Sequence, residues 1–328
     1  MSKPRILSGT RSTNDRLHLG NYEGAIQPWV ELQQDHQMFC MVADWHALTT
    51  LGDFPSNLRH NSREIAKDII ACGIDPEQSA VFVQSDVPEH AELHLLFSMI
   101  TGVGKLERVP TYKEKVSEIT GDRIVSYGLL GYPVLQSADI LLYKPVGVPV
   151  GKDQAPHLEL TREIARSFNA LYGEVFHDFK SIIPEDESRS KLPGLDMRKM
   201  SKSYDNCIYL NESNDETAKK LKSAFTTPSK MRKTDPGIPG GCAVCQYLKL
   251  YSPTWETQWS EDIAGERGCM QSTTELTELM IEVLRPIRER RAAIDDAMID
   301  DILKAGAMRA KEVAATTMDE VRRAMKLI

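Results

Sequence analysis

Two short segments of this sequence carry residue types that bind phosphate groups. The first is residues 18–21 (HLGN), and the second, about 180 residues later, is residues 199–203 (KMSKS). The second segment offers two mobile ammonium groups, from Lys199 and Lys202, and the hydroxyl groups of two serines. Either segment alone would be a weak indication, but the two in this order predict a nucleotide site built from both, with ATP as its ligand.

Such a site can carry out chemistry at phosphorus without a protein nucleophile. Attack on a phosphorus atom is accelerated mainly by placing the reactants and by neutralising the charge that grows in the transition state. Lys199 and Lys202, with Mg²⁺ carried by ATP, can neutralise that charge, and we predict catalytic roles for both lysines and for His18. An exposed basic loop explains most lysine pairs, but the intact five-residue string makes it the weaker explanation here.

The segment around His18 has the features of an anion-binding turn. We expect a strand, a polar loop over residues 9–17, and a helix that begins at Gly20 and Asn21 and directs free backbone N–H groups at an anion. Gly20 lets a ligand approach the backbone closely. Arg11 and His18 can bind phosphate or ribose oxygens. Taken by itself this segment is better explained as a solvated turn, and the lysine segment is what changes that interpretation.

The elements that must position these segments follow an α/β pattern. Between residues 4 and 160, short apolar runs alternate with longer amphipathic stretches, which predicts a Rossmann-like, doubly wound parallel sheet. Asn21 is expected to be the N-cap of one helix, Pro28 to kink or restart that helix, and Gly73 to end the next one. The expected strands are 6–8, 38–43, 80–84 and 146–150, and the expected helices are 21–34 and 55–72.

Beyond residue 210 the strand pattern disappears. Helices are predicted there over residues 212–225, 274–291 and 298–325. We therefore expect two domains: a Rossmann-like catalytic domain over residues 1–210 and an all-helical C-terminal domain over residues 211–328.

Composition limits the partners. The 328 residues carry a formal net charge of −7, which argues against a generally basic nucleic-acid coat and leaves local patches as the way to hold RNA. No stretch approaches the ~20 apolar residues of a spanning helix, and no apolar export segment follows Lys3 and Arg5. We expect a cytoplasmic protein with neither a membrane nor DNA as a partner.

The segments around these motifs resemble those of one known family, the bacterial tryptophanyl-tRNA synthetases, which are class I enzymes. The similar segments, in family order, are residues 8–26, 42–50, 106–115, 132–143, 148–165, 191–203 and 284–291. The resemblance implies a Rossmann-type catalytic domain, a helical tRNA-binding domain and a homodimer. It also implies a two-step reaction: L-tryptophan attacks the α-phosphate of ATP to give tryptophanyl-adenylate and pyrophosphate, and the acyl group then moves to tRNA(Trp).

The resemblance also implies roles for particular residues of the ATP site. Gly151, Lys152 and Asp153 would contact the ribose, and Leu192 the adenine region. The remaining ATP-binding residues would be Thr10, Arg11, Ser12, His18, Gly20, Asn21, Lys199, Met200, Ser201, Lys202 and Ser203.

Asp139 is the specificity residue that the resemblance implies. It would lie on a helix facing the amino-acid pocket, where its carboxylate can accept the indole N–H and reject phenylalanine. The other tryptophan-binding residues would be Gly9, His46, Tyr132, Gln136 and Gln154.

Four positions depart from the commoner family pattern. Arg11 and Ser12 stand where many relatives have Gln and Pro, Lys152 replaces a frequent Glu, and Gln136 occupies a position often held by Met. These changes bear on individual ATP and indole contacts and leave the reaction class intact.

Two other functions compete with this interpretation. A tyrosyl-tRNA synthetase shares the fold and both signatures, and Asp139 could accept a phenolic proton. Against tyrosine, Ile6 and Leu7 stand in the first strand where a tyrosine enzyme usually has a Tyr, and no extra RNA-binding module follows the helical part. A non-catalytic tRNA-binding paralogue would be expected to have lost the lysine loop, which is intact here.

The cysteines give expectations about the core and about metal binding. Cys40 and Cys72 fall in apolar segments and are expected to be core thiols. Some relatives carry a four-cysteine iron–sulfur site that Cys242 and Cys269 match in part, but Asp262 and Ser272 stand at the other two positions. We predict no cluster and no metal, with a vestigial or zinc-like site that includes Cys245 as the lesser alternative.

We expect two interaction surfaces, one for a second copy of the chain and one for tRNA. By resemblance, residues 97–130 form the dimer surface. The candidate cations for tRNA, for which a solvated face is an equally good explanation, are Lys219, Lys220, Lys222, Lys230, Arg232, Lys233, Arg285, Arg288, Arg290 and Arg291.

Overall fold

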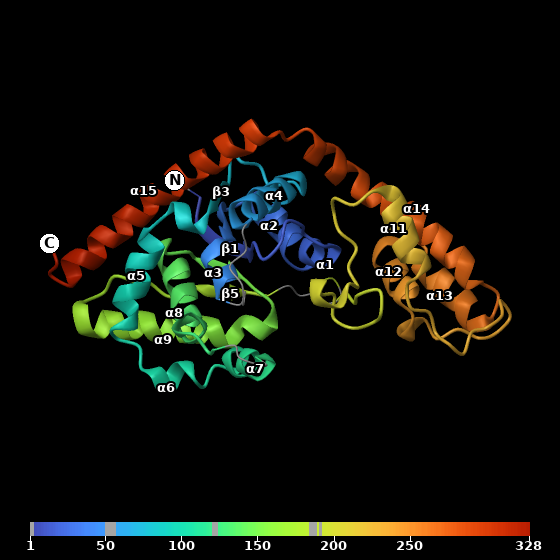
Figure 1. Ribbon diagram of the computed structural model, residues 1–328, viewed down its shortest axis with the longest axis horizontal. Coiled ribbons are helices and arrows are strands. Elements are labelled where there is room, and N and C mark those ends of the chain that lie inside the picture. Colours follow the sequence, from blue (N-terminus) through green and yellow to red (C-terminus); the bar gives the residue numbers. More distant parts are fainter. Residues whose placement is uncertain (1–2, 50–56, 120–123, 184–188, 190–191) are drawn as a thin grey trace.

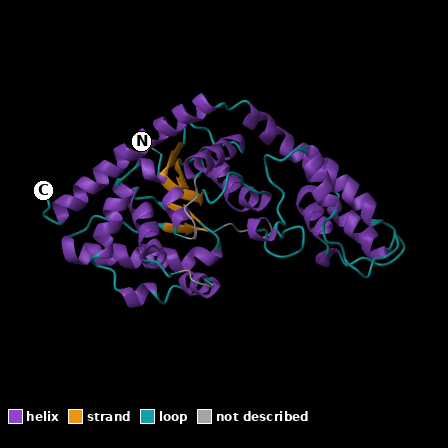
Figure 2. Ribbon diagram, in the orientation of Figure 1, coloured by secondary structure: helices purple, strands orange, loops and turns teal. Residues whose placement is uncertain are grey.

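The computed structural model describes residues 3–49, 57–119, 124–183, 189 and 192–328. The part of the expected second helix that precedes residue 57 lies outside the described residues. The centre of the structure is a five-stranded sheet in the order β3-β2-β1-β4-β5, enclosed by helices (Figure 2). All strand pairs are parallel. The strands are β1 (Arg5–Arg11), β2 (Gln37–Ala43), β3 (Ala80–Val83), β4 (Gly147–Pro149) and β5 (Lys180–Ile182).

This topology confirms the expected doubly wound α/β fold. The four predicted strands are present, and the chain builds outward from β1 first to β2 and β3 and later to β4 and β5. The strand order therefore reverses between β1 and β4, and ligands of such sheets bind beyond the carboxyl ends of the strands at that point. The segment after β1 begins the first predicted phosphate loop, and Gly151 follows β4, so both predicted ATP loops leave the sheet at the switch point.

β5 is a strand that the sequence analysis missed. It has only three residues (KSI), none of them buried, so it lacks the apolar run on which strand prediction depends.

The first helical segment begins earlier than expected. His18, not Asn21, is the N-cap of α1 (Leu19–Asn21): its ring accepts the backbone N–H of Asn21, and the Asn21 side chain accepts the backbone N–H of His18. A π-turn over Tyr22–Ile26 follows and leads into α2 (Gln27–Leu32), with Pro28 in its first turn. Pro28 therefore restarts the helix, as one of the two expected outcomes, because it lacks the N–H that a mid-helix position needs.

The remaining helices of the α/β part surround the sheet (Figure 1). The end of the second predicted helix is confirmed, because Gly73 follows it with φ +116°, a value that favours glycine. The helices that surround the sheet are α3 (Asp44–Leu48), α4 (Leu58–Ala71), α5 (Glu89–Ser98), α6 (Val103–Leu106), α7 (Pro110–Glu118), α8 (Tyr127–Leu142) and α9 (Ala155–Tyr172).

Beyond residue 210 the described chain is helical, as expected. The sequence analysis missed two of these helices, α12 (Ala243–Tyr251) and α13 (Trp255–Ala264), which lie close to the Pro- and Gly-rich stretch 227–241. The others are α11 (Asn214–Lys222), α14 (Cys269–Ala292) and α15 (Asp296–Ala324). No helix among the described residues is both long and apolar enough to cross a bilayer.

α15 returns to the sheet. It runs along one edge of the molecule, away from α11–α14 (Figure 1), and its apolar side is buried in the same core as Phe82 of β3 and Phe97 of α5. The division into domains at residue 210 stays a prediction, and this helix packs on the α/β part although its sequence lies in the predicted helical domain.

The contact between α15 and β3 depends on Gly306. A β-carbon at this position would lie 1.9 Å from the carbonyl oxygen of Val81, so the helix backbone rests directly on the strand. We expect Gly306→Val to lower the free energy of unfolding by about 3 kcal/mol or more, because overpacking here forces the two elements apart. Chemical denaturation measures this. Gly104→Ala on α6, where the added carbon would meet only the flexible side chain of Arg108 at 4.0 Å, is the control and should be close to neutral.

Candidate active site

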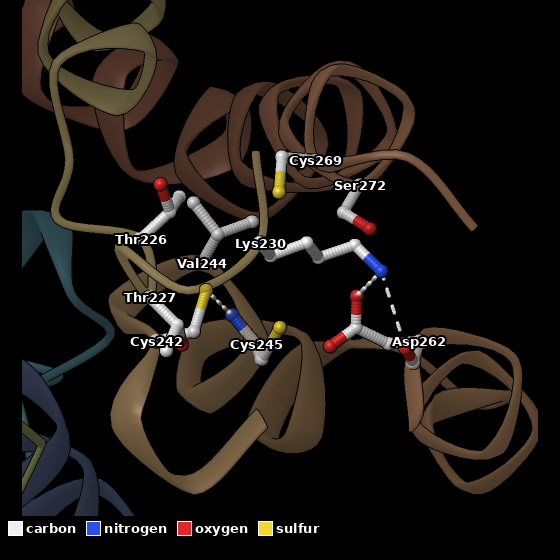
Figure 3. A pocket seen from close by; sticks show the side chains of 9 residues that line it. All are labelled: Thr226, Thr227, Lys230, Cys242, Val244, Cys245, Asp262, Cys269 and Ser272. Carbon is white, nitrogen blue, oxygen red and sulfur yellow. Dashed lines mark hydrogen bonds and ion pairs between the residues drawn. The ribbon is translucent and has the colours of Figure 1, made fainter. Parts of the chain in front are cut away.

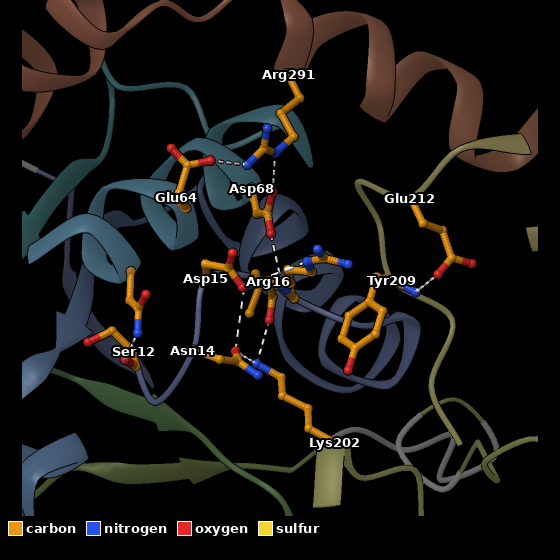
Figure 4. A network of polar contacts seen from close by, with 12 residues as sticks. Ser12, Asn14, Asp15, Arg16, Glu64, Asp68, Lys202, Tyr209, Glu212 and Arg291 are labelled. Atoms are coloured by element: carbon orange, nitrogen blue, oxygen red, sulfur yellow. Dashed lines mark hydrogen bonds and ion pairs between the residues drawn. The ribbon is translucent and has the colours of Figure 1, made fainter. Parts of the chain in front are cut away.

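The two predicted phosphate segments lie against each other (Figure 4). The backbone N–H of Gly20 points at the sulfur of Met200 at 3.2 Å. The ammonium group of Lys202 donates to the side chain of Asn14 and to the carbonyl oxygen of Arg16. The expectation that folding joins these distant segments is confirmed.

The segment that follows the lysine loop also pairs with the first loop. Leu19 N donates to Ile208 O at 2.8 Å, and Leu210 N donates to Leu17 O at 3.0 Å. The two bonds form an antiparallel bridge between His18 and Tyr209. The position of the lysine loop is therefore fixed by backbone pairing just beyond it.

Asn206 organises the lysine loop from within. Its side chain is buried, accepts Ser201 N at 2.8 Å, and donates to Lys199 O at 3.1 Å and to Asp196 Oδ1 at 2.7 Å. A β-carbon on Gly194 would lie 2.2 Å from the Asn206 amide, so this glycine makes room for it. Sequence analysis missed Asn206 because it lies outside the five-residue string.

We expect Asn206→Ala to release the loop. The change removes three hydrogen bonds at once, each worth about 1 kcal/mol net, so trypsin should cut after the exposed Lys199 at least about tenfold faster. Limited proteolysis followed by mass spectrometry measures the rate. Asn169→Ala is the matched control, since Asn169 ties the 175–176 segment by similar bonds and should not change cleavage at Lys199.

His18 is held as a neutral ring. Burial, reinforced by the nearby charge of Lys202, lowers its pKa to about 4. Nδ1 accepts the N–H of Asn21, so the proton of the neutral ring is on Nε2, which makes that atom a donor. A neutral Nε2–H can donate to a phosphate or ribose oxygen.

The two lysines of the loop have different surroundings. Lys199 is exposed. Burial, together with the charge of Arg11, lowers the pKa of Lys202 to about 8, while Cys207, Asp68 and Asp15 act in the opposite direction. Lys202 therefore remains largely protonated at neutral pH but is close to losing its charge.

The other predicted ATP residues divide into two groups. Thr10 and Arg11 end β1, and Gly151, Lys152 and Asp153 follow β4, so these five lie at the switch point of the sheet.

Ser12 and Leu192 are engaged with the protein. The hydroxyl of Ser12 has no exposed surface and accepts from Ser62 on α4 at 3.1 Å, and Leu192 is buried in the core together with Met200. The side chain of Ser203 lies outside the described residues.

Asp139 is the centre of a buried polar cluster. It lies on α8 as predicted, and only 2% of the residue is exposed. His46 Nε2 lies 2.7 Å from Oδ2, His90 Nδ1 lies 2.7 Å from Oδ1, and Gln84 Nε2 donates to both oxygens. Burial alone would raise the pKa of Asp139, but the charge of His90 and the bonds from both histidines outweigh it and hold the pKa well below its usual value. The carboxylate is therefore ionised.

The other predicted amino-acid residues lie on β1, on α8 and directly before α9. Tyr132 is buried on α8, and its hydroxyl lies 2.5 Å from Thr111 Oγ1. Burial raises the pKa of Tyr132, and the hydrogen bond with Thr111 and the charge of Arg11 oppose that shift. Gly9 on β1 pairs in register with Met41, Gln154 donates to Asp153, and Gln136 is half-buried.

Three residues in or near the Asp139 cluster were not predicted from the sequence. Gln84 directly follows β3, so its place at the carboxyl end of a strand was an available indication. His90 on α5 carried no such indication, because it meets Asp139 only through tertiary packing. His157 on α9 carried none either, and its Nε2 lies 2.7 Å from the Thr111 hydroxyl that contacts Tyr132.

A small pocket lies in the helical part, away from these residues (Figure 3). Its lining includes Cys242, Cys245 and Cys269, and Lys230 crosses it to pair with Asp262 at 3.1 Å. Within the described ranges, no three His, Cys, Asp or Glu side chains are arranged to hold a metal ion. The absence of a cluster stays a prediction. Cys40 and Cys72 are core thiols, as expected.

Several of the cations considered for tRNA are engaged with other parts of the chain. Arg288 donates to Leu210 O, Asn214 and Thr217, and Arg290 donates to Ala71 O at 2.6 Å. Lys220 pairs with Glu212, and Lys230 is buried. The exposed members are Lys219, Lys222, Arg232, Lys233, Arg285 and Arg290, of which Arg285 pairs with Glu282 and Arg290 is engaged as described.

Comparison with known proteins agrees with this geometry. Residues 1–287 match the model of the family described as tRNA synthetases class I (W and Y), and the chain belongs to that family. Over its full length it is similar to proteins named tryptophan–tRNA ligase: it is 48% identical to that of Thermotoga maritima over 99% of both chains, and 40% identical to that of Aquifex aeolicus over 98% of this chain and 100% of that one.

Solved structures show the same similarity. Tryptophanyl-tRNA synthetase from Campylobacter jejuni, complexed with ADP and tryptophan, superposes with a TM-score of 0.87 at 33% identity, over 98% of this chain and 99% of that one. The resemblance drawn from the sequence is confirmed, as is the class of enzyme, an aminoacyl-tRNA synthetase.

Proposed function

We propose that this chain is a tryptophan–tRNA ligase that first converts L-tryptophan and MgATP to tryptophanyl-adenylate and pyrophosphate, and then transfers the tryptophanyl group to tRNA(Trp). The observation that carries the proposal is the pairing of two features in one fold. Lys202 closes the lysine loop over the His18 loop, and a buried ionised Asp139 lies in the adjoining half of the α/β part.

In the first step, Asp139 accepts the indole N–H, and the residues around it bind the rest of the amino acid. The predicted set is Gly9, His46, Tyr132, Gln136 and Gln154. His46 Nε2 already donates to Asp139, so it either shares the carboxylate with the indole or gives way to it. Tyrosine has no N–H at the corresponding position, and its phenol would have to reach the same carboxylate.

The phosphate groups of MgATP lie between the two closing segments in this proposal. The neutral Nε2–H of His18 donates to an oxygen. The backbone N–H groups of α1, which were expected to be free for an anion, are instead directed at Ile208 O, the sulfur of Met200 and the His18 ring. Lys199 and Lys202 neutralise the charge that passes to the leaving pyrophosphate as tryptophan attacks the α-phosphorus. Mg²⁺ enters with the nucleotide as part of the substrate.

For the second step, the helical residues 211–328 supply cations for tRNA. The exposed Lys219, Lys222, Arg232 and Lys233 are the side chains best able to meet phosphates, since the other candidates are paired or buried. Their replacement would weaken tRNA binding and would also make that binding less dependent on salt concentration.

Homodimer formation through residues 97–130 is supported by exposed apolar side chains. Met99 is 69% exposed, Ile124 83% and Tyr127 66%, and large apolar side chains exposed within one segment are expected of an interaction surface. Sedimentation of the purified chain tests this. The cytoplasmic location stays a prediction.

One assay tests the proposed function: ATP–pyrophosphate exchange with tryptophan and tyrosine measured side by side. Exchange that depends on tryptophan alone is expected. Exchange stimulated only by tyrosine would reverse the substrate, and exchange with neither would favour the non-catalytic paralogue.

A further inference from the structure

A buried carboxylate outside the predicted site joins the His18 loop to the C-terminal helices (Figure 4). Asp68, on α4, has no exposed surface. Its Oδ2 accepts the backbone N–H of Leu17 at 2.8 Å, and its Oδ1 accepts the Nε–H of Arg291 at 2.5 Å. The two oxygens of one side chain thus serve two segments that lie far apart in the sequence.

The bond to Leu17 fixes the position of the His18 loop. Leu17 is almost fully buried, and its carbonyl oxygen already accepts Leu210 N. Without Asp68, its N–H would be left buried with no partner, which native proteins avoid. The next residue, His18, begins the helix that faces the phosphates in the proposed function, so a shift of Leu17 moves His18.

The bond to Arg291 favours the charged form of the carboxylate. Arg291 lies in the last turn of α14 and also pairs with Glu64. Burial raises the pKa of Asp68, while Arg291 and the N–H of Leu17 oppose that shift. Because a buried carboxylate is costly unless paired, removal of Arg291 weakens the acceptor on which Leu17 depends.

Other ion pairs connect α4 to the junction of α14 and α15 without reaching the loop. Lys67 pairs with Asp296 at 2.8 Å, and Arg63 pairs with Asp300 at 2.9 Å. Their acidic partners are largely exposed. These pairs share the location of the Asp68 contact and lack its bond to the loop, which makes them natural controls.

We propose that Asp68 is a positioning residue for the phosphate-binding loop and that Arg291 of α14 holds it in place, so that the C-terminal helices act on ATP binding through this carboxylate. The proposal rests on the proposed function, because it takes the His18 loop as part of the ATP site. It adds a residue and a route of coupling that the two motifs do not contain.

The test uses Asp68→Asn and Arg291→Met in the full-length chain. Asp68→Asn keeps the shape and removes the charge, and we expect the Kd for MgATP, measured by calorimetry, to rise about tenfold, as for loss of a hydrogen bond to a buried charged group. Arg291→Met should raise it about threefold for the same reason. The KM for tryptophan in the exchange assay should stay within about twofold, because the bonds of Asp68 go to Leu17 and Arg291 and not to Asp139 or its partners.

The double variant and a control separate positioning from general stability. If Arg291 acts through Asp68, the double variant should bind MgATP no more weakly than Asp68→Asn alone. Asp300→Asn should leave the Kd unchanged. The proposal is wrong if Arg291→Met binds MgATP like Asp300→Asn, or if the Asp68 variant weakens tryptophan and ATP equally. If the unaltered chain shows no tryptophan-dependent exchange, the proposed function fails, while the MgATP affinities still decide the role of Asp68.

Discussion

Replacement of Asp139 by alanine is expected to lower kcat/KM for tryptophan in the exchange assay by about 10²–10³-fold, because loss of one partner of a buried, hydrogen-bonded charge costs about 2–5 kcal/mol. Asp139 is buried, ionised and bonded by His46, His90 and Gln84. Its removal deletes the acceptor for the indole N–H and leaves three donors aimed at an apolar side chain. Steady-state kinetics at fixed MgATP measure the loss.

The selectivity for tryptophan over phenylalanine is a more specific readout of the Asp139→Ala change than the rate. A site that hydrogen-bonds its substrate rejects an analogue without the donor by about 10⁴–10⁵-fold, so the preference for tryptophan over phenylalanine should collapse in Asp139→Ala. Glu92→Ala is the control: Glu92 lies on α5 near His90 but pairs with Arg322 of α15, and its loss should leave selectivity unchanged. An Asp139→Ala enzyme that discriminates as the unaltered chain does would remove Asp139 from this role.

The fold was predictable where a pattern lies within one element. Apolar runs predicted four strands, and Gly73 predicted the end of the helix that precedes it. The start of α1 was misplaced because His18 caps through a ring nitrogen, whereas the common capping residues are Ser, Thr, Asp and Asn. The return of α15 to the sheet could not be foreseen, since it depends on a close backbone contact at Gly306 and not on the helical period of its sequence.

The residues of the candidate site likewise divide into those predictable from a single segment and those identified only by the folded structure. His18 and Lys202 stand in strings short enough to be read along the chain, and the structure joins those strings. Asp68, His90 and Asn206 hold the predicted residues in place through contacts with segments distant in sequence or outside the motifs. Nothing local distinguishes these three from ordinary polar residues of helices and loops, so only tertiary packing identifies them.

Replacement of Lys202 by methionine is expected to lower kcat/KM for ATP by about 10²–10³-fold, the usual cost of one group that stabilises transition-state charge. Lys202 is held over the His18 loop by Asn14 and Arg16, so its ammonium group needs little rearrangement to meet the phosphates. Lys219→Met, at an exposed position on α11, controls for loss of a positive charge and should change the rate of exchange little.

The pH dependence gives a second test of Lys202. Burial lowers the pKa of its ammonium group to about 8, so the charged form is present below that pH and is lost as the pH rises through it. Since kcat/KM reports ionisation of the free enzyme, its value for ATP should fall about tenfold per pH unit above about pH 8. Lys202→Arg, whose guanidinium stays charged throughout this range, should lose the alkaline fall whatever its absolute rate. An unchanged alkaline limb in this variant would show that another group titrates there.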